Sequence, residues 1–180
     1  MSGILNYLTF TLTSTNEYSD IPDHFTNCFT RIDMSSQFEP RDPDFKSRVM
    51  QSFSEQSVMQ TIKASLVTVE PGHVEIELPY RRELTQQDGF IHAGISSTIM
   101  DSACGYAAFT LMPSEARVLT IEFKINLLAP AAGDHFRAIG KVRKTGRSLF
   151  VAEADLYAMG DETEKLVATM VGTLMAVNPQ

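Results

Sequence analysis

Tryptophan is absent from this 180-residue chain, and only two cysteines, Cys28 and Cys104, occur in it. Two cysteines are too few for a disulfide scaffold, so we expect a protein of the reducing cytoplasm. Basic residues are also scarce, because 15 lysines and arginines stand against 22 acidic residues and leave a net charge of −7. This balance disfavours a broad nucleic-acid-binding surface, and no nucleic-acid partner is expected.

Long hydrophobic runs are missing as well. No stretch reaches the roughly 20 apolar residues of a membrane-spanning helix, so no membrane span is expected. The chain carries no lysine or arginine before Glu17, which predicts no secretory signal peptide. Metal-binding spacings, a Gly-x-Ser-x-Gly motif and a glycine-rich phosphate loop are absent too, so we expect no metal ion, no cofactor and no serine-type hydrolase.

The hydrophobic content of 43% is sufficient for the core of one domain with an appendage. Residues 1–36 follow neither a helical nor a strand period, so we expect an N-terminal extension there and a single domain over residues 37–180. Two interpretations of the extension stay open. Either the natural start is Met34, or the upstream residues form a loosely attached arm.

Periodicity within the domain predicts an α+β fold. Asp42 is the expected N-cap and Pro43 the first residue of a helix, and a second short helix is expected over residues 56–62. A hairpin over residues 66–78 precedes an apolar helix near residues 93–112, and strands are expected over residues 118–128, 136–144, 148–159 and 166–177. Since the central helix is apolar all round, we expect a mostly antiparallel sheet to curl around it.

Alternation assigns faces to two of these strands. The strand over residues 118–128 is expected to have one apolar face, formed by Leu119, Ile121, Phe123, Ile125 and Leu127. The next is expected to bury Phe136, Ala138, Gly140 and Val142 and to expose Arg137, Lys141 and Arg143.

Asp101 is the single charged residue of the apolar helix. A buried carboxylate is costly, which makes Asp101 a candidate functional residue, although it could equally face a wet subunit seam or bond a nearby hydroxyl. The helix begins in the run Gly89–Gly94, where free N–H groups can polarise a carbonyl. Asp101 lies roughly 10 to 12 Å further along the helix, so a partner subunit would have to supply it to the same reaction centre.

A wider pattern surrounds these residues. The opening His92-Ala93-Gly94 is followed by Asp101 seven residues after Gly94, and Asn126 and Pro130 stand in a later strand and at its end. Carried by QQDGFIHAGISSTIMDSACGYAA and VLTIEFKINLLAPAAGDHFRAIGKVRKTGR, this pattern resembles the PaaI-like branch of the hotdog-fold thioesterases over roughly residues 56–177. The one departure is Ala93, where the family has glycine. Alanine keeps the N–H, but it fits only if the backbone there needs no positive φ.

The resemblance implies hydrolysis of acyl- or aryl-coenzyme A and assigns roles to the residues. Asp101 would be the base or nucleophile across a dimer interface, and the N–H of Ala93 or Gly94 would polarise the thioester carbonyl. His92 would orient the loop or assist the leaving thiolate. Gln86 would lie near the attacking water and Thr120 would face the site, although either could be an ordinary polar residue.

A basic cluster is the remaining candidate site, formed by Arg137, Lys141, Arg143, Lys144 and Arg147. These cations could hold the phosphates of coenzyme A. Alternatively, they form a solvated sheet face that balances Glu153 and Asp155.

Three functions remain to be weighed. The first is the thioesterase, expected as a homodimer or a tetramer of two dimers. The others are a non-catalytic acyl-coenzyme A sensor, which the Ala93 departure leaves open, and a hydratase, whose pattern does not match. Candidate acyl-lining residues are Phe53, Met59, Met100 and Phe109, which are equally typical of a core.

Overall fold

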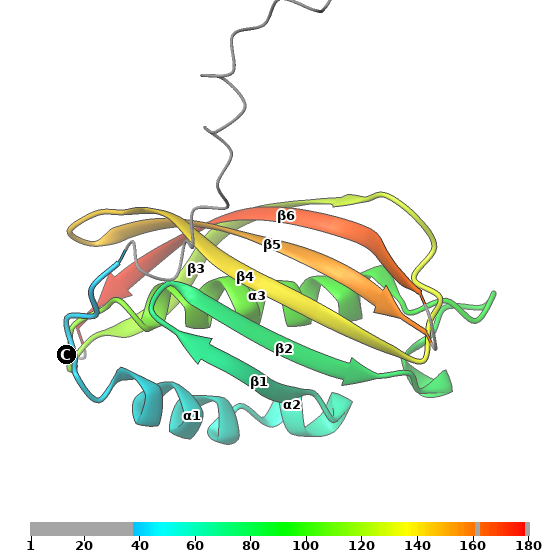
Figure 1. The fold of residues 1–180 in the computed structure, drawn as a ribbon, viewed down its shortest axis with the longest axis horizontal. Coiled ribbons are helices and arrows are strands. Elements are labelled where there is room, and N and C mark those ends of the chain that lie inside the picture. The colour runs from blue at the N-terminus through cyan, green and yellow to red at the C-terminus, as the bar shows by residue number, and fades with distance from the viewer. Residues whose placement is uncertain (1–37, 161–162, 179–180) are drawn as a thin grey trace, which may run out of the picture. The chain divides into compact units, whose positions relative to one another are not determined.

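The computed structural model describes residues 38–160 and 163–178. The expected extension over residues 1–36, and with it the choice of Met34 as the start, lies outside the described residues. The elements follow the predicted order (Figure 1): α1 (Phe45–Glu55), α2 (Ser57–Ile62), β1 (Ser65–Glu70), β2 (His73–Pro79), a 3₁₀ turn (Arg82–Leu84), α3 (Ala93–Phe109), β3 (Arg117–Leu127), β4 (His135–Thr145), β5 (Leu149–Met159) and β6 (Glu164–Val177).

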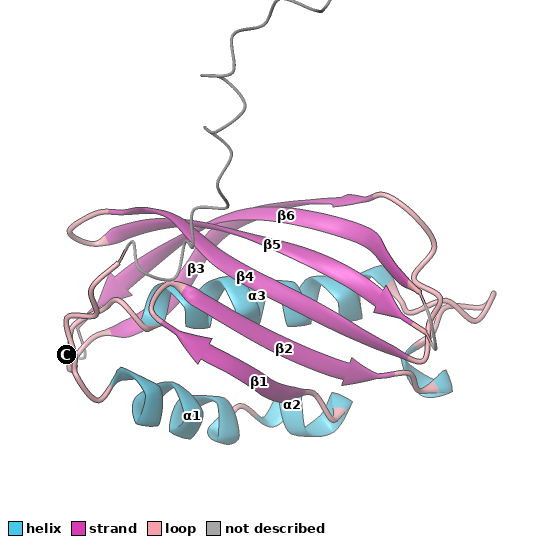
Figure 2. Cartoon of the chain, in the orientation of Figure 1, coloured by secondary structure: helices cyan, strands magenta, loops and turns pink. Residues whose placement is uncertain are grey.

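The six strands form one antiparallel sheet in the order β1-β2-β4-β5-β6-β3. The sheet curls around α3, while α1 and α2 lie beside β1 (Figure 2). Within the described residues, no helix is both long and apolar enough to cross a membrane. The antiparallel sheet curled around one long helix is the hotdog architecture, so the expected α+β fold class is confirmed.

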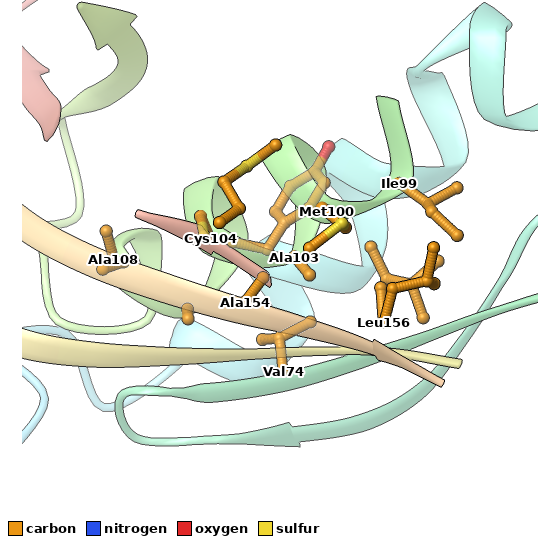
Figure 3. Close-up of a cluster of buried hydrophobic side chains, with 14 of the residues drawn as sticks. Val74, Ile99, Met100, Ala103, Cys104, Ala108, Ala154 and Leu156 are labelled. Carbon is orange, nitrogen blue, oxygen red and sulfur yellow. The ribbon is translucent and has the colours of Figure 1, made fainter. Parts of the chain in front are cut away.

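The core lies between α3 and the concave face of the sheet (Figure 3). Ile99, Met100 and Ala103 of α3 are fully buried, together with Val74 of β2 and Leu156 of β5. The tightest approach is at Gly140 of β4, where a Cβ would lie 2.3 Å from the carbonyl oxygen of Ala103. Only glycine allows the helix backbone to come so close to the strand.

The faces of β4 match the prediction, with Phe136, Ala138, Gly140 and Val142 buried. The single apolar face predicted for β3 is wrong, because the pairing of β3 with β6 shifts between Thr120 and Glu122. A bulge of this kind adds one residue and exchanges the faces of the strand beyond it. Thr120 pairs with buried Leu174 on the inner face, and after the bulge Ile125 takes that face opposite buried Met170. Leu119 therefore lies on the outer face and Ile125 on the inner one.

The start of α1 also differs from the prediction. The helix begins at Phe45, because Asp42 Oδ1 accepts the N–H of Asp44 at 2.9 Å and closes a turn before the helix. Asp42 is held there by Arg48, whose Nε lies 3.0 Å from Asp42 Oδ2. The carboxylate predicted to cap the helix is thus buried and paired with the partly exposed Arg48.

Arg48 joins α1 to the end of α3. It donates to the carbonyls of Phe109, at 3.1 Å, and Met112, at 2.8 Å, and also to that of Pro113. The Phe109 and Pro113 carbonyls also accept backbone N–H groups, whereas the Met112 carbonyl accepts from Arg48 alone among the described residues. The helix ends at Phe109, three residues before the predicted end. The chain then turns as far as Pro113, and Arg48 donates to the carbonyls of Met112 and Pro113 in this turn.

Candidate active site

Asp101 lies in the middle of α3 and is partly buried against β3. Thr120 of β3 donates its hydroxyl to Asp101 Oδ1 at 2.8 Å. Burial raises the pKa of Asp101 above its usual range, while the bond from Thr120 acts in the opposite direction. The structure thus brings the two predicted residues together and leaves Asp101 Oδ2 without a partner among the described residues.

A cavity of about 260 Å³, which we call the Asp101 cavity, opens in front of this carboxylate. Helix α1 forms one wall of it, which the sequence did not predict. Polar residues of an amphipathic helix carry no signal that separates a cavity wall from a solvent-exposed face. The cavity is lined by Ser52, Glu55, Gln56, Asp101, Ser102, Gly105, Tyr106, Val118 and Thr120.

His92 shapes the start of α3. It is the N-cap, with extended backbone at φ −61° and ψ 138°, and its Nδ1 accepts the N–H of Gly94 at 2.9 Å. The N–H of Gly94 is therefore occupied. Of the two expected carbonyl-polarising donors, only the N–H of Ala93 has no acceptor among the described residues.

Alanine at position 93 fits the backbone. Among the described residues other than glycine, only Lys63 has a positive φ. Ala93 is the first helical residue and keeps its N–H without strain, so replacement of the family's glycine removes no donor. Ala93 therefore gives no reason to regard the protein as a non-catalytic sensor.

Gln86 lies in the tight loop that precedes α3. Its backbone N–H donates to Phe90 at 2.9 Å, and its side-chain amide contacts Asp88 through both ends. Gln86 and Ala93 both line a second cavity of about 440 Å³, which we call the helix-start cavity. The rest of its lining is mostly apolar and includes Phe90, Ile91, Ser96, Leu127, Leu128, Ala129, Pro130, Ala131, Val167 and Ala168.

The predicted catalytic residues thus fall into two groups in one chain. Asp101 and Thr120 line the Asp101 cavity, whereas Gln86 and Ala93 line the helix-start cavity. Asp101 follows Ala93 by eight positions in one continuous helix, which corresponds to about 12 Å along its axis.

The basic cluster is not brought to either cavity. Arg137, Lys141 and Arg143 lie on the outer face of β4, opposite the face that packs on α3. Arg137 is paired with Glu77 at 2.6 Å, and Arg143 is paired with Glu153. The pair between Arg143 and Glu153 is the charge balance that we considered as the alternative to binding the phosphates of coenzyme A. Lys144 and Arg147 follow toward the β4–β5 turn, where Arg41 donates to the carbonyl of Arg147 at 3.4 Å.

Comparisons with known proteins agree on one family. The model of the thioesterase superfamily matches residues 88–165. A solved structure of a thioesterase family protein from Silicibacter pomeroyi is 53% identical, with a TM-score of 0.74, and the match covers 75% of this chain and 99% of that one.

Two further relatives were found by sequence comparison. A Saccharolobus solfataricus protein named as an esterase is 31% identical over 116 residues, which are 64% of this chain and 80% of the relative. A 1,4-dihydroxy-2-naphthoyl-CoA hydrolase from Listeria monocytogenes is 27% identical over 110 residues, which are 61% of this chain and 87% of that enzyme. A solved structure of the E. coli PaaI protein shares the fold, with a TM-score of 0.68 at 16% identity over 76% of this chain and 96% of that one. The resemblance to the hotdog-fold thioesterases found in the sequence is confirmed: the chain belongs to the thioesterase superfamily and is a hotdog-fold thioesterase.

Proposed function

We propose that this thioesterase hydrolyses acyl- or aryl-coenzyme A at a site shared by two subunits. The N–H of Ala93 polarises the thioester carbonyl, and Asp101 of the partner subunit acts as base or nucleophile. A coenzyme A thioester is supported by the Listeria monocytogenes relative, whose name describes the hydrolysis of an aryl-coenzyme A. Gln86 lines the same cavity as Ala93 and is assigned to hold the attacking water, through the second amide N–H and the second oxygen lone pair that its contacts with Asp88 leave free.

One observation carries the proposal, namely that the donor and the carboxylate line different cavities of the same chain. One thioester carbon cannot contact both groups across about 12 Å of helix. A second subunit related by a twofold axis would join the Ala93 side of one chain to the Asp101 side of the other.

The edge strand β3 offers the surface for this assembly. Leu119, Phe123 and Leu127 are 54%, 43% and 57% exposed on it. An unpaired edge with large apolar side chains favours pairing with another strand. We therefore expect β3 of two subunits to pair into one continuous sheet, in a dimer or in a tetramer of two dimers.

The chemistry follows from the two groups. In the base route, Asp101 takes a proton from water as the water oxygen bonds the carbonyl carbon, and the N–H of Ala93 stabilises the oxyanion. Collapse breaks the C–S bond and releases the thiolate, which takes up the proton. In the nucleophile route, the carboxylate displaces the thiolate and water then hydrolyses the anhydride. His92 supports both routes by occupying the N–H of Gly94 and fixing the start of the helix.

A heterodimer tests the shared site. Ala93→Pro removes the donor N–H, and proline is tolerated at the first position of a helix when the preceding residue is extended, as His92 is. Asp101→Asn removes the carboxylate. Each homodimer should be inactive, whereas a heterodimer of the two variants, isolated through two different tags, contains one intact site.

The heterodimer should recover about half of the parent's rate of thiol release. No recovery in a folded heterodimer would show that each chain uses its own Ala93 and Asp101, and the proposal would fail.

A further inference from the structure

The wall of the helix-start cavity carries two polar side chains. Among the described residues that line it, only Gln86 and Ser96 have side chains that can form hydrogen bonds. Ser96 stands on α3, three residues after Ala93, and is only 2% exposed. A buried hydroxyl thus lines the same cavity as the N–H that is proposed to polarise the thioester carbonyl.

Ser96 differs from the two hydroxyl residues that follow it on α3. Ser97 Oγ donates to the carbonyl of Ala93 at 2.8 Å, and Thr98 Oγ1 donates to the carbonyl of Gly94 at 2.8 Å. Such bonds to the preceding turn are usual for hydroxyl residues within a helix. Ser96 Oγ makes no bond of this kind and has no hydrogen-bond partner among the described residues. Because buried polar groups are rarely left unpaired, a hydroxyl that lines a cavity is suited to bond what enters the cavity.

The start of α3 leaves room for a second donor to the thioester oxygen. His92 Nδ1 accepts the N–H of Gly94 at 2.9 Å, so that only the N–H of Ala93 remains of the two backbone donors considered for this oxygen. An oxyanion has more than one lone pair, and it is stabilised by donors that are already in place around it. A single N–H therefore uses only part of the oxygen's capacity to accept hydrogen bonds.

The place of Ser96 on the helix suits it to be this donor. Residues three apart are neighbours on a helix, with Cβ atoms about 5 to 6 Å apart. Helical side chains also lean toward the N-terminus, so the side chain of Ser96 leans toward the turn that begins at Ala93. One oxygen can accept from two donors that lie up to roughly 6 Å apart, because each bond spans about 2.9 Å. The spacing of Ala93 and Ser96 therefore allows both to bond one carbonyl oxygen.

We propose that Ser96 is a further catalytic residue, whose hydroxyl donates to the thioester carbonyl oxygen together with the N–H of Ala93. This inference rests on the proposed function. As the attacking oxygen bonds the carbonyl carbon, an electron pair moves onto the carbonyl oxygen, and the bond from Ser96 strengthens while its proton stays on Oγ. The pair returns when the C–S bond breaks and the thiolate leaves. Ser96 thus acts on the carbonyl oxygen, whereas Gln86 acts on the water.

Ser96→Ala tests the inference in the full chain. It removes the hydroxyl and leaves the backbone, and it should keep or raise the melting temperature, because alanine favours the helix and no bond to the described residues is lost. Values of kcat and KM are measured by thiol release from hexanoyl- and benzoyl-coenzyme A. The matched control is Ser97→Ala, which makes the same change at the next residue, where the hydroxyl is bonded within the helix and lines neither cavity.

A bond that strengthens in the transition state changes kcat more than KM. Loss of one oxyanion donor should lower kcat of Ser96→Ala by about 10² and keep KM within about threefold of the parent, whereas Ser97→Ala should keep kcat within about twofold. A fall in kcat of less than about tenfold, or a change confined to KM, overturns the inference alone. No thiol release by the parent from either ester defeats the proposed function itself.

A spectroscopic measurement separates a bond to the carbonyl oxygen from a role of Ser96 elsewhere. The probe is a ketone analogue of the better ester, in which a methylene replaces the sulfur and the carbonyl carbon is labelled with ¹³C. Donors to the oxygen weaken the C=O bond, so the stretching frequency of the bound ketone should be higher in Ser96→Ala than in the parent and in Ser97→Ala. An equal frequency in all three proteins would show that Ser96 does not bond this oxygen, whatever its effect on kcat, and would overturn the inference.

Discussion

Replacement of Asp101 by asparagine separates chemistry from folding at the centre of the site. Asparagine keeps the shape of the side chain, and its carbonyl oxygen can still accept the hydroxyl of Thr120 that now bonds Oδ1 at 2.8 Å. The amide nitrogen then takes the place of Oδ2. An amide nitrogen can donate but can neither take a proton from water nor attack a carbonyl carbon.

The size of the effect follows from what is lost. A positioned general base contributes about 10² to 10⁴ in rate, which corresponds to roughly 3 to 5 kcal/mol of transition-state stabilisation. Because the donor N–H and both cavities remain, KM should change little. We therefore expect Asp101→Asn to lower kcat by about 10² to 10⁴.

Stability should move in the opposite direction. Burial raises the pKa of folded Asp101, whereas the unfolded chain has the ordinary value of about 3.9. Between these values the folded state binds more protons, so the contribution of Asp101 to the free energy of unfolding falls as pH rises from about 4 through the folded-state pKa. Asparagine lacks this dependence, and the variant should gain stability relative to the parent over that interval.

Steady-state thiol release and urea denaturation at several pH values measure both effects on the same preparations. Thr120→Val is the companion variant, because it removes the hydroxyl and keeps the carboxylate. If Asp101→Asn keeps kcat within about twofold of the parent but unfolds the protein, Asp101 is structural and the mechanism is wrong.

Three further outcomes are expected. Gly140→Ala should destabilise the fold by about 3 kcal/mol in urea denaturation, since its Cβ would lie 2.3 Å from the oxygen of Ala103, and a loss below about 0.5 kcal/mol would contradict the close packing. Arg48→Met should lower the free energy of unfolding by about 3 kcal/mol, because it leaves the buried carboxylate of Asp42 without its cation and the carbonyl of Met112 without its donor; an unchanged melting temperature would contradict this. If the basic cluster holds the phosphates of coenzyme A, the double reversal Arg143→Glu and Arg147→Glu should raise KM for a coenzyme A ester more than for an N-acetylcysteamine ester, and equal effects would exclude that role.

Most of the fold could be predicted because its elements have clear periods. The apolar helix α3 requires a sheet on nearly all sides, and its close contact with β4 is visible in the sequence as Gly140 at an inward position. The error in β3 has a local cause. A bulge at Ile121 changes the face of the residues beyond it, and an unbroken alternation of apolar residues gives no sign of the extra residue.

The site divides in the same way. Asp101 could be predicted because one carboxylate in an apolar helix is conspicuous, and Thr120 because it matches a family position. The cavity wall formed by α1 could not be predicted, because it depends on how α1 packs against α3 near Asp101. The apolar candidates for the acyl lining belong to the core, namely Phe53, Met59, Met100 and Phe109. Most residues that line the Asp101 cavity instead carry a polar group.

The exposed residues of β3 connect assembly to catalysis. In one chain, apolar side chains on an open edge strand add little to folding and favour aggregation. Their presence is explained if the strand is covered in the working protein, and the same pairing would join the Ala93 side of one chain to the Asp101 side of the other. The edge that disfavours an isolated subunit is then the feature that completes the site. It follows that a charge placed on this edge, as in Phe123→Glu, should remove dimerisation and activity together while the core of each subunit stays folded.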